Sequence, residues 1–100
     1  MKNVVVVGGP HAFVSGQFRR HLEGVGLTVV GHYTNFEGEK VRFTELPMAC
    51  DGVIVINSMT SHKIMLKVKA AAESRHLPFI GVPHKWSLAE SVLRRFNFIH

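Results

Sequence analysis

Hydrophobic residues return along the chain in two alternating patterns, one typical of buried strands and the other of amphipathic helices. Four short apolar runs, rich in β-branched residues, have the composition of parallel strands that are buried on both faces. Between and after them, apolar residues recur at the three- and four-residue spacing of a helix. The predicted strands are 4–7, 27–31, 53–56 and 77–82, and the predicted helices lie within 13–25, 61–72 and 88–96. The segment 33–50 has only a weak pattern and stays unassigned.

Polar residues and glycines mark the expected ends of these helices. Gly24 and Gly26 are expected to end the first helix. Thr60 or Ser61 is expected to cap the second helix. The third helix follows the pattern of a capping box, in which Ser87 and Glu90 would satisfy each other's backbone amides.

This alternation of strands and helices predicts one α/β domain over residues 1–100, because neither a repeat nor a linker interrupts it. Right-handed crossovers then favour a small three-layer sandwich, flavodoxin-like or Rossmann-like, with about four parallel strands in the order 2-1-3-4. Ligands of such sheets bind outside the carboxyl ends of the strands. Four of the seven histidines follow successive strands and are therefore expected at that edge: His11, His32, His62 and His84.

Two turns at this edge are candidate ligand sites. Gly8 and Gly9, followed by His11, would let an anion approach the backbone, or would simply form a tight strand-to-helix turn. The turn after the third strand offers hydroxyls, an amide, an imidazole and an ammonium group where a helix begins. Its candidate ligand contacts are Asn57, Ser58, Ser61, His62 and Lys63, although plain helix capping explains part of this pattern.

The loop after the fourth strand is a third candidate. His84 and Trp86 would line the far side of the site, with the indole stacking on a base, or Trp86 would only pack against the following helix. The spacing of the histidines matches no zinc motif, so no metal and no cofactor are expected. The single cysteine, Cys50, excludes an internal disulfide and is expected to be an inert core residue.

The charge of the chain narrows the class of partner. Twelve basic and seven acidic residues give a net charge of +5, which favours anionic partners or serves only solubility. A nucleotide-like small molecule is the expected ligand, and nucleic acid is the alternative. With neither a signal-peptide pattern nor an apolar run long enough to span a membrane, the chain is expected in the cytoplasm, away from membranes.

Three functions fit these residues. The first is a binding module that senses or sequesters a phosphate-bearing nucleotide or a signal derived from one. The second is a small enzyme acting on such a compound, with His62 or His11 as general base. The third is a non-catalytic partner-binding protein: the apolar tail 96–100 looks exposed and would pack against a second copy, which predicts a homodimer.

Several short motifs together resemble a bacterial family, the domain of unknown function 2325. They are the run Val4–Gly9 with His11 nearby, the segment Cys50–Ile56, the pair Ser61-His62, Lys67, and Leu77-Pro78-Phe79. The resemblance implies the α/β fold but no activity. Gly9-Pro10 after the first strand is also similar to nucleoside 2-deoxyribosyltransferase-like domains, whose catalytic glutamate has no counterpart shortly after Ser61. That likeness implies a nucleotide-binding fold without the nucleophile.

Overall fold

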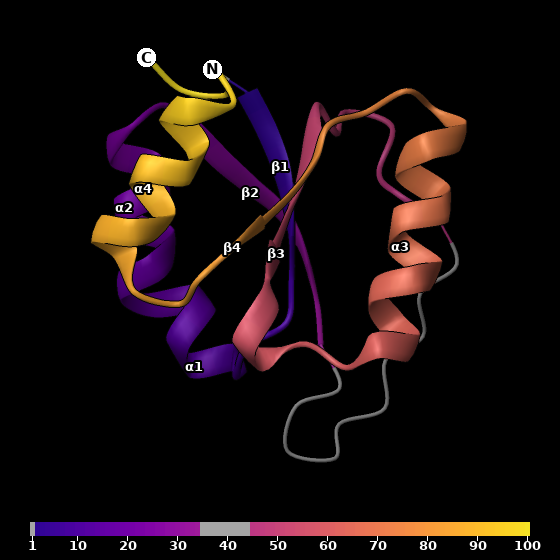
Figure 1. Ribbon diagram of the computed structural model, residues 1–100, viewed down its shortest axis with the longest axis horizontal. Coiled ribbons are helices and arrows are strands. Elements are labelled where there is room, and N and C mark those ends of the chain that lie inside the picture. The colour runs from indigo at the N-terminus through magenta and orange to yellow at the C-terminus, as the bar shows by residue number, and fades with distance from the viewer. Residues whose placement is uncertain (1, 35–44) are drawn as a thin grey trace.

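Four parallel strands in the order β2-β1-β3-β4 form the centre of the protein (Figure 1). The computed structural model describes residues 2–34 and 45–100. The strands are β1 (Lys2–Val7), β2 (Leu27–Tyr33), β3 (Gly52–Ile56) and β4 (Phe79–Val82). The predicted α/β class and strand order are confirmed. Strand β4 begins two residues later than expected because the Leu77 amide still donates to Ala72 O, within the last turn of the preceding helix.

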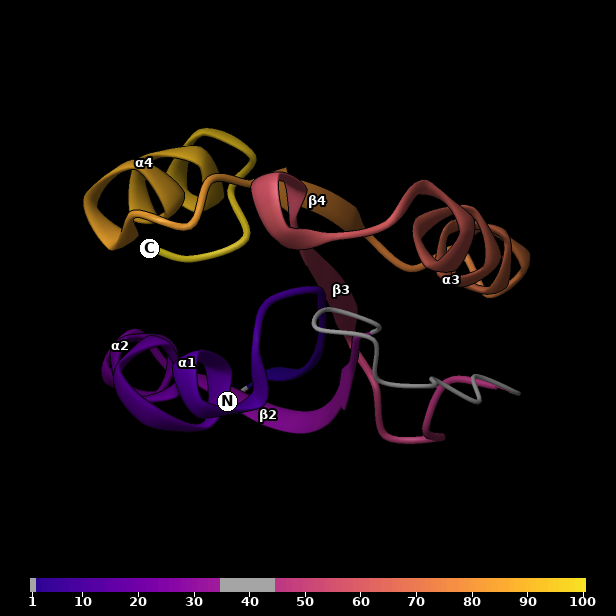
Figure 2. The same ribbon diagram turned by 90° about the horizontal axis from the view of Figure 1, so that it is seen from below.

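Helices cover both faces of this sheet (Figures 1 and 2). On one face lie α4 (Trp86–Arg95) and a continuous helical run made of α1 (His11–Phe13), η1 (Val14–Phe18) and α2 (Arg19–Gly24). The other face carries α3 (His62–Ser74), which follows the short turn η3 (Asn57–Met59). The first predicted helix is thus present, but it is kinked at Gly16, whose φ of −95° and ψ of −114° are not helical.

The side chains of β1 supply both halves of the core. Val4 and Val6 pack with the residues under α2 and α4, whereas Val5 and Val7 pack with those under α3. All four are completely buried. Burial on both faces explains why the strand is an unbroken run of valines rather than an alternation of apolar and polar residues.

The two expected helix caps have different outcomes. Ser61 does cap α3, since its hydroxyl accepts a hydrogen bond from the Ile64 amide at 3.4 Å. The capping box is wrong: α4 begins at Trp86, so Ser87 lies inside its first turn. Lys85 is the N-cap residue, and its carbonyl accepts the amides of Leu88 and Ala89 at 3.1 and 3.0 Å. Within residues 2–34 and 45–100, no side chain caps this helix.

The C-terminal tail is not the exposed apolar segment that the sequence suggested. Phe98 and Ile99 are buried in the chain's own core. The Lys2 ammonium donates to Phe98 O at 2.9 Å and lies 4.4 Å from the centre of the Phe98 ring. A side chain at Gly52 would collide with that ring, because its Cβ would lie 2.6 Å from Phe98 Cζ. The expected homodimer therefore loses its stated basis and stays a prediction.

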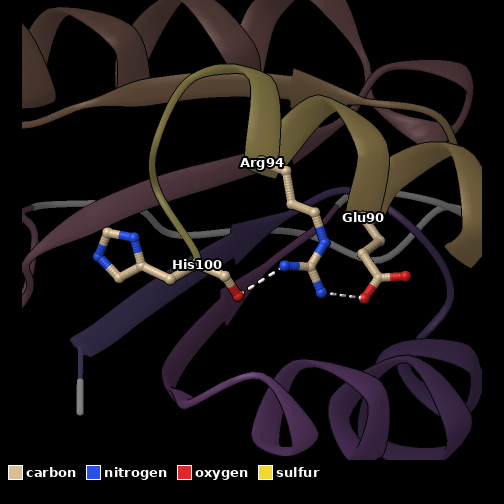
Figure 3. A network of polar contacts seen from close by, with 3 residues as sticks. All are labelled: Glu90, Arg94 and His100. Carbon is tan, nitrogen blue, oxygen red and sulfur yellow. Dashed lines mark hydrogen bonds and ion pairs between the residues drawn. The ribbon is translucent and has the colours of Figure 1, made fainter.

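The Arg94 side chain links the C-terminal tail to α4 (Figure 3). One nitrogen of Arg94 donates to a carboxylate oxygen of Glu90 at 2.8 Å, and another donates to the carbonyl of His100 at 2.5 Å. The contact holds His100, the residue that follows Ile99, against the helix.

The turn after β1 depends on the absence of a side chain at Gly8. Gly8 has a φ of +94°, and a Cβ built there would lie only 1.8 Å from Thr60 Oγ1. Thr60 fills that space and donates to Ile56 O at 2.7 Å and to Val7 O at 3.2 Å. The end of β1 and the loop after β3 are thereby joined.

The segment before β3, which contains the buried Cys50, is hydrogen-bonded to Arg75 at the end of α3. The Arg75 guanidinium donates to the carbonyls of Leu46, Pro47 and Met48 at 3.0 to 3.1 Å. Cys50 is buried, as expected, and its thiol donates to Gly52 O at 3.2 Å. Burial raises the pKa of the Cys50 thiol above its ordinary value.

Replacing Phe98 with Ala should lower the free energy of unfolding by about 3 kcal/mol, because it leaves a cavity in the core. Phe96 is the matched control, since it lies two residues away and is 63% exposed. Phe96→Ala should change stability by less than about 0.5 kcal/mol. Urea denaturation of both variants measures the difference, and equal losses would contradict the packing described for the tail.

Gly8→Ala should destabilise the protein by about 3 kcal/mol, because it combines a left-handed backbone with a collision against Thr60. Gly24 ends α2, and apart from its chain neighbours and its own helix backbone, no atom of the described residues lies within 4 Å of an added Cβ. Gly24→Ala should therefore raise stability by about 0.5 kcal/mol. Thermal denaturation of the pair tests the argument, which fails if Gly8→Ala melts with the parent.

Iodoacetamide should alkylate Cys50 at least ~10-fold more slowly in the native protein than in urea, because the thiol is buried and its raised pKa lowers the thiolate fraction. Mass spectrometry of samples quenched over time gives both rates. A native rate equal to the denatured one would place the thiol at the surface.

Candidate functional site

The residues expected at the carboxyl edge of the sheet fall into separate groups. Ser58 and His84 come together, as do His11 and His32. Trp86 lies with residues of the first helical run that the sequence analysis did not select. Ser61, His62 and Lys63 stand at the start of α3, the helix on the opposite face of the sheet from α4.

A cavity of about 280 Å³ lies between the first helical run and the start of α4. We call it the Trp86 pocket; its lining residues are Phe13, Gln17, Phe18, His21, His84, Lys85 and Trp86. The Trp86 indole stacks on the His21 imidazole with centroids 5.1 Å apart and planes 7° apart. Its edge contact with Phe18 has centroids 5.9 Å apart at 87°. The indole is therefore held by aromatic neighbours on one side of the pocket.

Four lining residues of this pocket from the first helical run were missed from the sequence, and so was Lys85. Phe13, Gln17 and His21 follow one another at four-residue intervals, a spacing that places side chains on one face of a helix. That spacing could have predicted part of the pocket lining, since it sets polar side chains at positions 17 and 21 beside the apolar stripe. His21 lies within α2 and is therefore not one of the histidines that follow a strand.

The Ser58 hydroxyl and the His84 imidazole form a direct contact. Ser58 Oγ lies 3.0 Å from His84 Nδ1, and both residues are exposed. Ser58 belongs to η3, directly after β3, and His84 follows β4, so the neighbouring strands β3 and β4 carry the two side chains. Asn57, the first residue of the same turn, has its side-chain amide against Gly81 of β4, where an added Cβ would lie 2.7 Å from it.

His11 and His32 form a second pair beyond β1. Their rings stack with centroids 6.0 Å apart and planes 22° apart. His32 Nε2 lies 2.8 Å from Gly8 O, which fixes the imidazole against the turn after β1. A cavity of about 230 Å³ adjoins both rings and Arg19, whose guanidinium is paired with Glu23 at 2.9 Å.

The amides of Gly8 and Gly9 are used within the protein. Gly8 N donates to Tyr33 O at 2.8 Å, and Gly9 N donates to Met59 O at 2.9 Å. These hydrogen bonds satisfy the donors that the sequence offered to an anion. Gly9 therefore holds the loop after β3, which carries Ser58, against the turn after β1, and Gly8 joins that turn to the end of β2.

Neither a metal centre nor a membrane span stands out in the described parts of the chain. Across residues 2–34 and 45–100, no three histidine, cysteine or carboxylate side chains are grouped so that they could hold a metal ion. None of the helices described above is long and apolar enough to cross a bilayer.

Comparison with known proteins gives a family and no closer relative. No curated protein and no solved structure matches the chain significantly. The family that matches, DUF2325, is described as an uncharacterized protein conserved in bacteria, and the match covers residues 3–94, from the start of β1 almost to the end of α4. This protein therefore belongs to the DUF2325 family.

Proposed function

We propose that the Trp86 pocket binds a small ligand in which a planar ring is joined to an anionic group, as in a nucleotide. The observation that carries the proposal is the meeting of aromatic and cationic groups in one cavity. Trp86, His21 and Phe13 offer ring surfaces, and Lys85 offers an ammonium group beside them. Planar rings pack on aromatic side chains, and ammonium groups bind phosphate oxygens.

The size of the cavity limits the ligand. About 280 Å³ is close to the lower bound of ~300 Å³ typical of small-molecule sites. A mononucleotide with its base in the pocket suits this volume better than a dinucleotide does. The proposal therefore concerns a mononucleotide-sized ligand.

The electrostatic character of the pocket favours an anion. The seven described residues that line it include one lysine, two histidines and no acid. The chain as a whole carries a net charge of +5, which raises the local concentration of anions. Ser58, hydrogen-bonded to His84, places a hydroxyl group beside this residue of the pocket lining.

This proposal keeps some of the residues expected from the sequence and sets others aside. Ser58, His84 and Trp86 remain ligand contacts, with Asn57 beside them on the same turn. His62 and Lys63 are not assigned to the ligand, because they do not line the pocket and begin the helix on the other face. In the first instance, the module would sense or sequester its ligand and release it unchanged.

Trp86 is the chain's one tryptophan, so its fluorescence reports directly on the pocket. Titration with AMP should change that fluorescence and should give a dissociation constant about 10-fold lower than titration with adenosine. The reason is that a hydrogen bond between charged groups contributes about 1.5 kcal/mol or more. Equal affinities for the two compounds, or no change with either, would contradict the proposal.

The Lys85→Gln variant tests whether Lys85 is the cation that binds the phosphate of AMP. It should weaken AMP about 10-fold and leave adenosine unchanged, since only the phosphate contact is lost. Lys67→Gln removes the same charge from an exposed position on α3 and should change AMP affinity less than about 2-fold. Equal losses in both variants would mean that AMP responds to net charge rather than to this pocket.

A further inference from the structure

The geometry points to a catalytic pair at the same edge of the sheet: Ser58 as nucleophile and His84 as its general base, accepting an acyl group from an aromatic carboxylic ester. The inference rests on the 3.0 Å contact between Ser58 Oγ and His84 Nδ1. A hydroxyl and an imidazole within hydrogen-bond reach are the minimum that an activated serine requires. It does not depend on nucleotide binding, which needs neither a nucleophile nor a base.

The proton has a defined route in this arrangement. In the tautomer that carries its proton on Nε2, His84 Nδ1 accepts the hydrogen bond donated by Ser58 Oγ. As Oγ bonds to the ester carbonyl carbon, the Oγ proton passes to Nδ1. The bond between that carbon and the alcohol oxygen then breaks, and the imidazolium returns the proton to the departing alcohol. Water attacks the resulting acyl-serine by the same route and releases the carboxylic acid.

The backbone around Ser58 is held in place. Gly9 N donates to Met59 O, and Thr60 Oγ1 donates to Ile56 O and Val7 O. These contacts tie Met59 and Thr60, the two residues after Ser58, to the turn after β1 and to the ends of β1 and β3. A fixed turn keeps the nucleophile in register with its base, which is how positioned groups lower a barrier.

The surroundings indicate the class of substrate. Both side chains are exposed, so a substrate carbonyl has access to Oγ. His84 also lines the Trp86 pocket, whose aromatic walls suit the aromatic part of an ester. Lys85 also lines that pocket, and an ammonium group turned toward Ser58 would offset the negative charge that develops on the carbonyl oxygen.

The test is acylation of the full chain by p-nitrophenyl acetate. We expect a burst of p-nitrophenolate of about one equivalent per chain, as acyl-enzymes give. Peptide mapping by mass spectrometry should place the acetyl group on Ser58. Ser58→Ala should abolish both, whereas Ser91→Ala, which changes an exposed serine on α4, should change neither.

The His84→Gln variant tests whether His84 acts as the general base for Ser58 or only lies next to it. It keeps a hydrogen-bonding side chain at an exposed position and should slow acetylation of Ser58 about 100-fold or more. His62→Gln, at an exposed histidine next to Ser61, should leave the rate unchanged. Acetylation scattered over lysines with no excess at Ser58 overturns the inference. So does acetylation of Ser58 at the parental rate in a folded His84→Gln variant. Either result would leave the proposal of nucleotide binding standing, because the AMP titration tests that proposal separately.

Discussion

Burial of β1 and β3 on both faces is the constraint from which the rest of this structure follows. The apolar side chains of these strands, Val4–Val7 and Val53–Ile56, are fully buried. A strand with apolar groups on both sides needs a covering layer on each, so helices must lie above and below the sheet. With both faces covered, the sheet edges that carry the connecting loops are left for a ligand.

The handedness of the connections decides which polar groups meet at the carboxyl edge. The chain moves from β1 to β2 in one direction and from β3 to β4 in the other, and right-handed crossovers therefore place α1–α2 and α3 on opposite faces. The start of α3 cannot share a pocket with α2, although both follow carboxyl ends of strands. This separation isolates His62 from the His21–Trp86 pair.

The fold could be predicted from the sequence because each strand and helix has a recognisable local pattern of hydrophobic and polar residues. The valines of β1, the Ser61 cap and the order of the strands all follow from short-range patterns and the crossover rule.

Prediction from the sequence failed where a local pattern competes with the packing of side chains. Ser87 and Glu90 match a capping box, but docking of Trp86 against Phe18 and His21 accompanies a helix that begins two residues earlier. The burial of Phe98 depends on Gly52 and Lys2, both far away in the sequence. The predicted strand order places Ser58 and His84 at the same edge, but their direct contact joins side chains 26 residues apart, and no sequence motif displays it.

The bond from Lys2 to Phe98 O joins positions 96 residues apart. Contacts of such long sequence separation form slowly, because a large loop must close before they contribute. On the ribosome, β1, β2 and β3 are synthesised well before the segment that seals their α4-facing side. During that interval Val4, Val6 and Ile54 lack the cover that Leu93, Phe98 and Ile99 supply. The apolar surface of these strands that faces α4 therefore stays uncovered until residues 93–99 have been synthesised, so the C-terminal residues complete the core last.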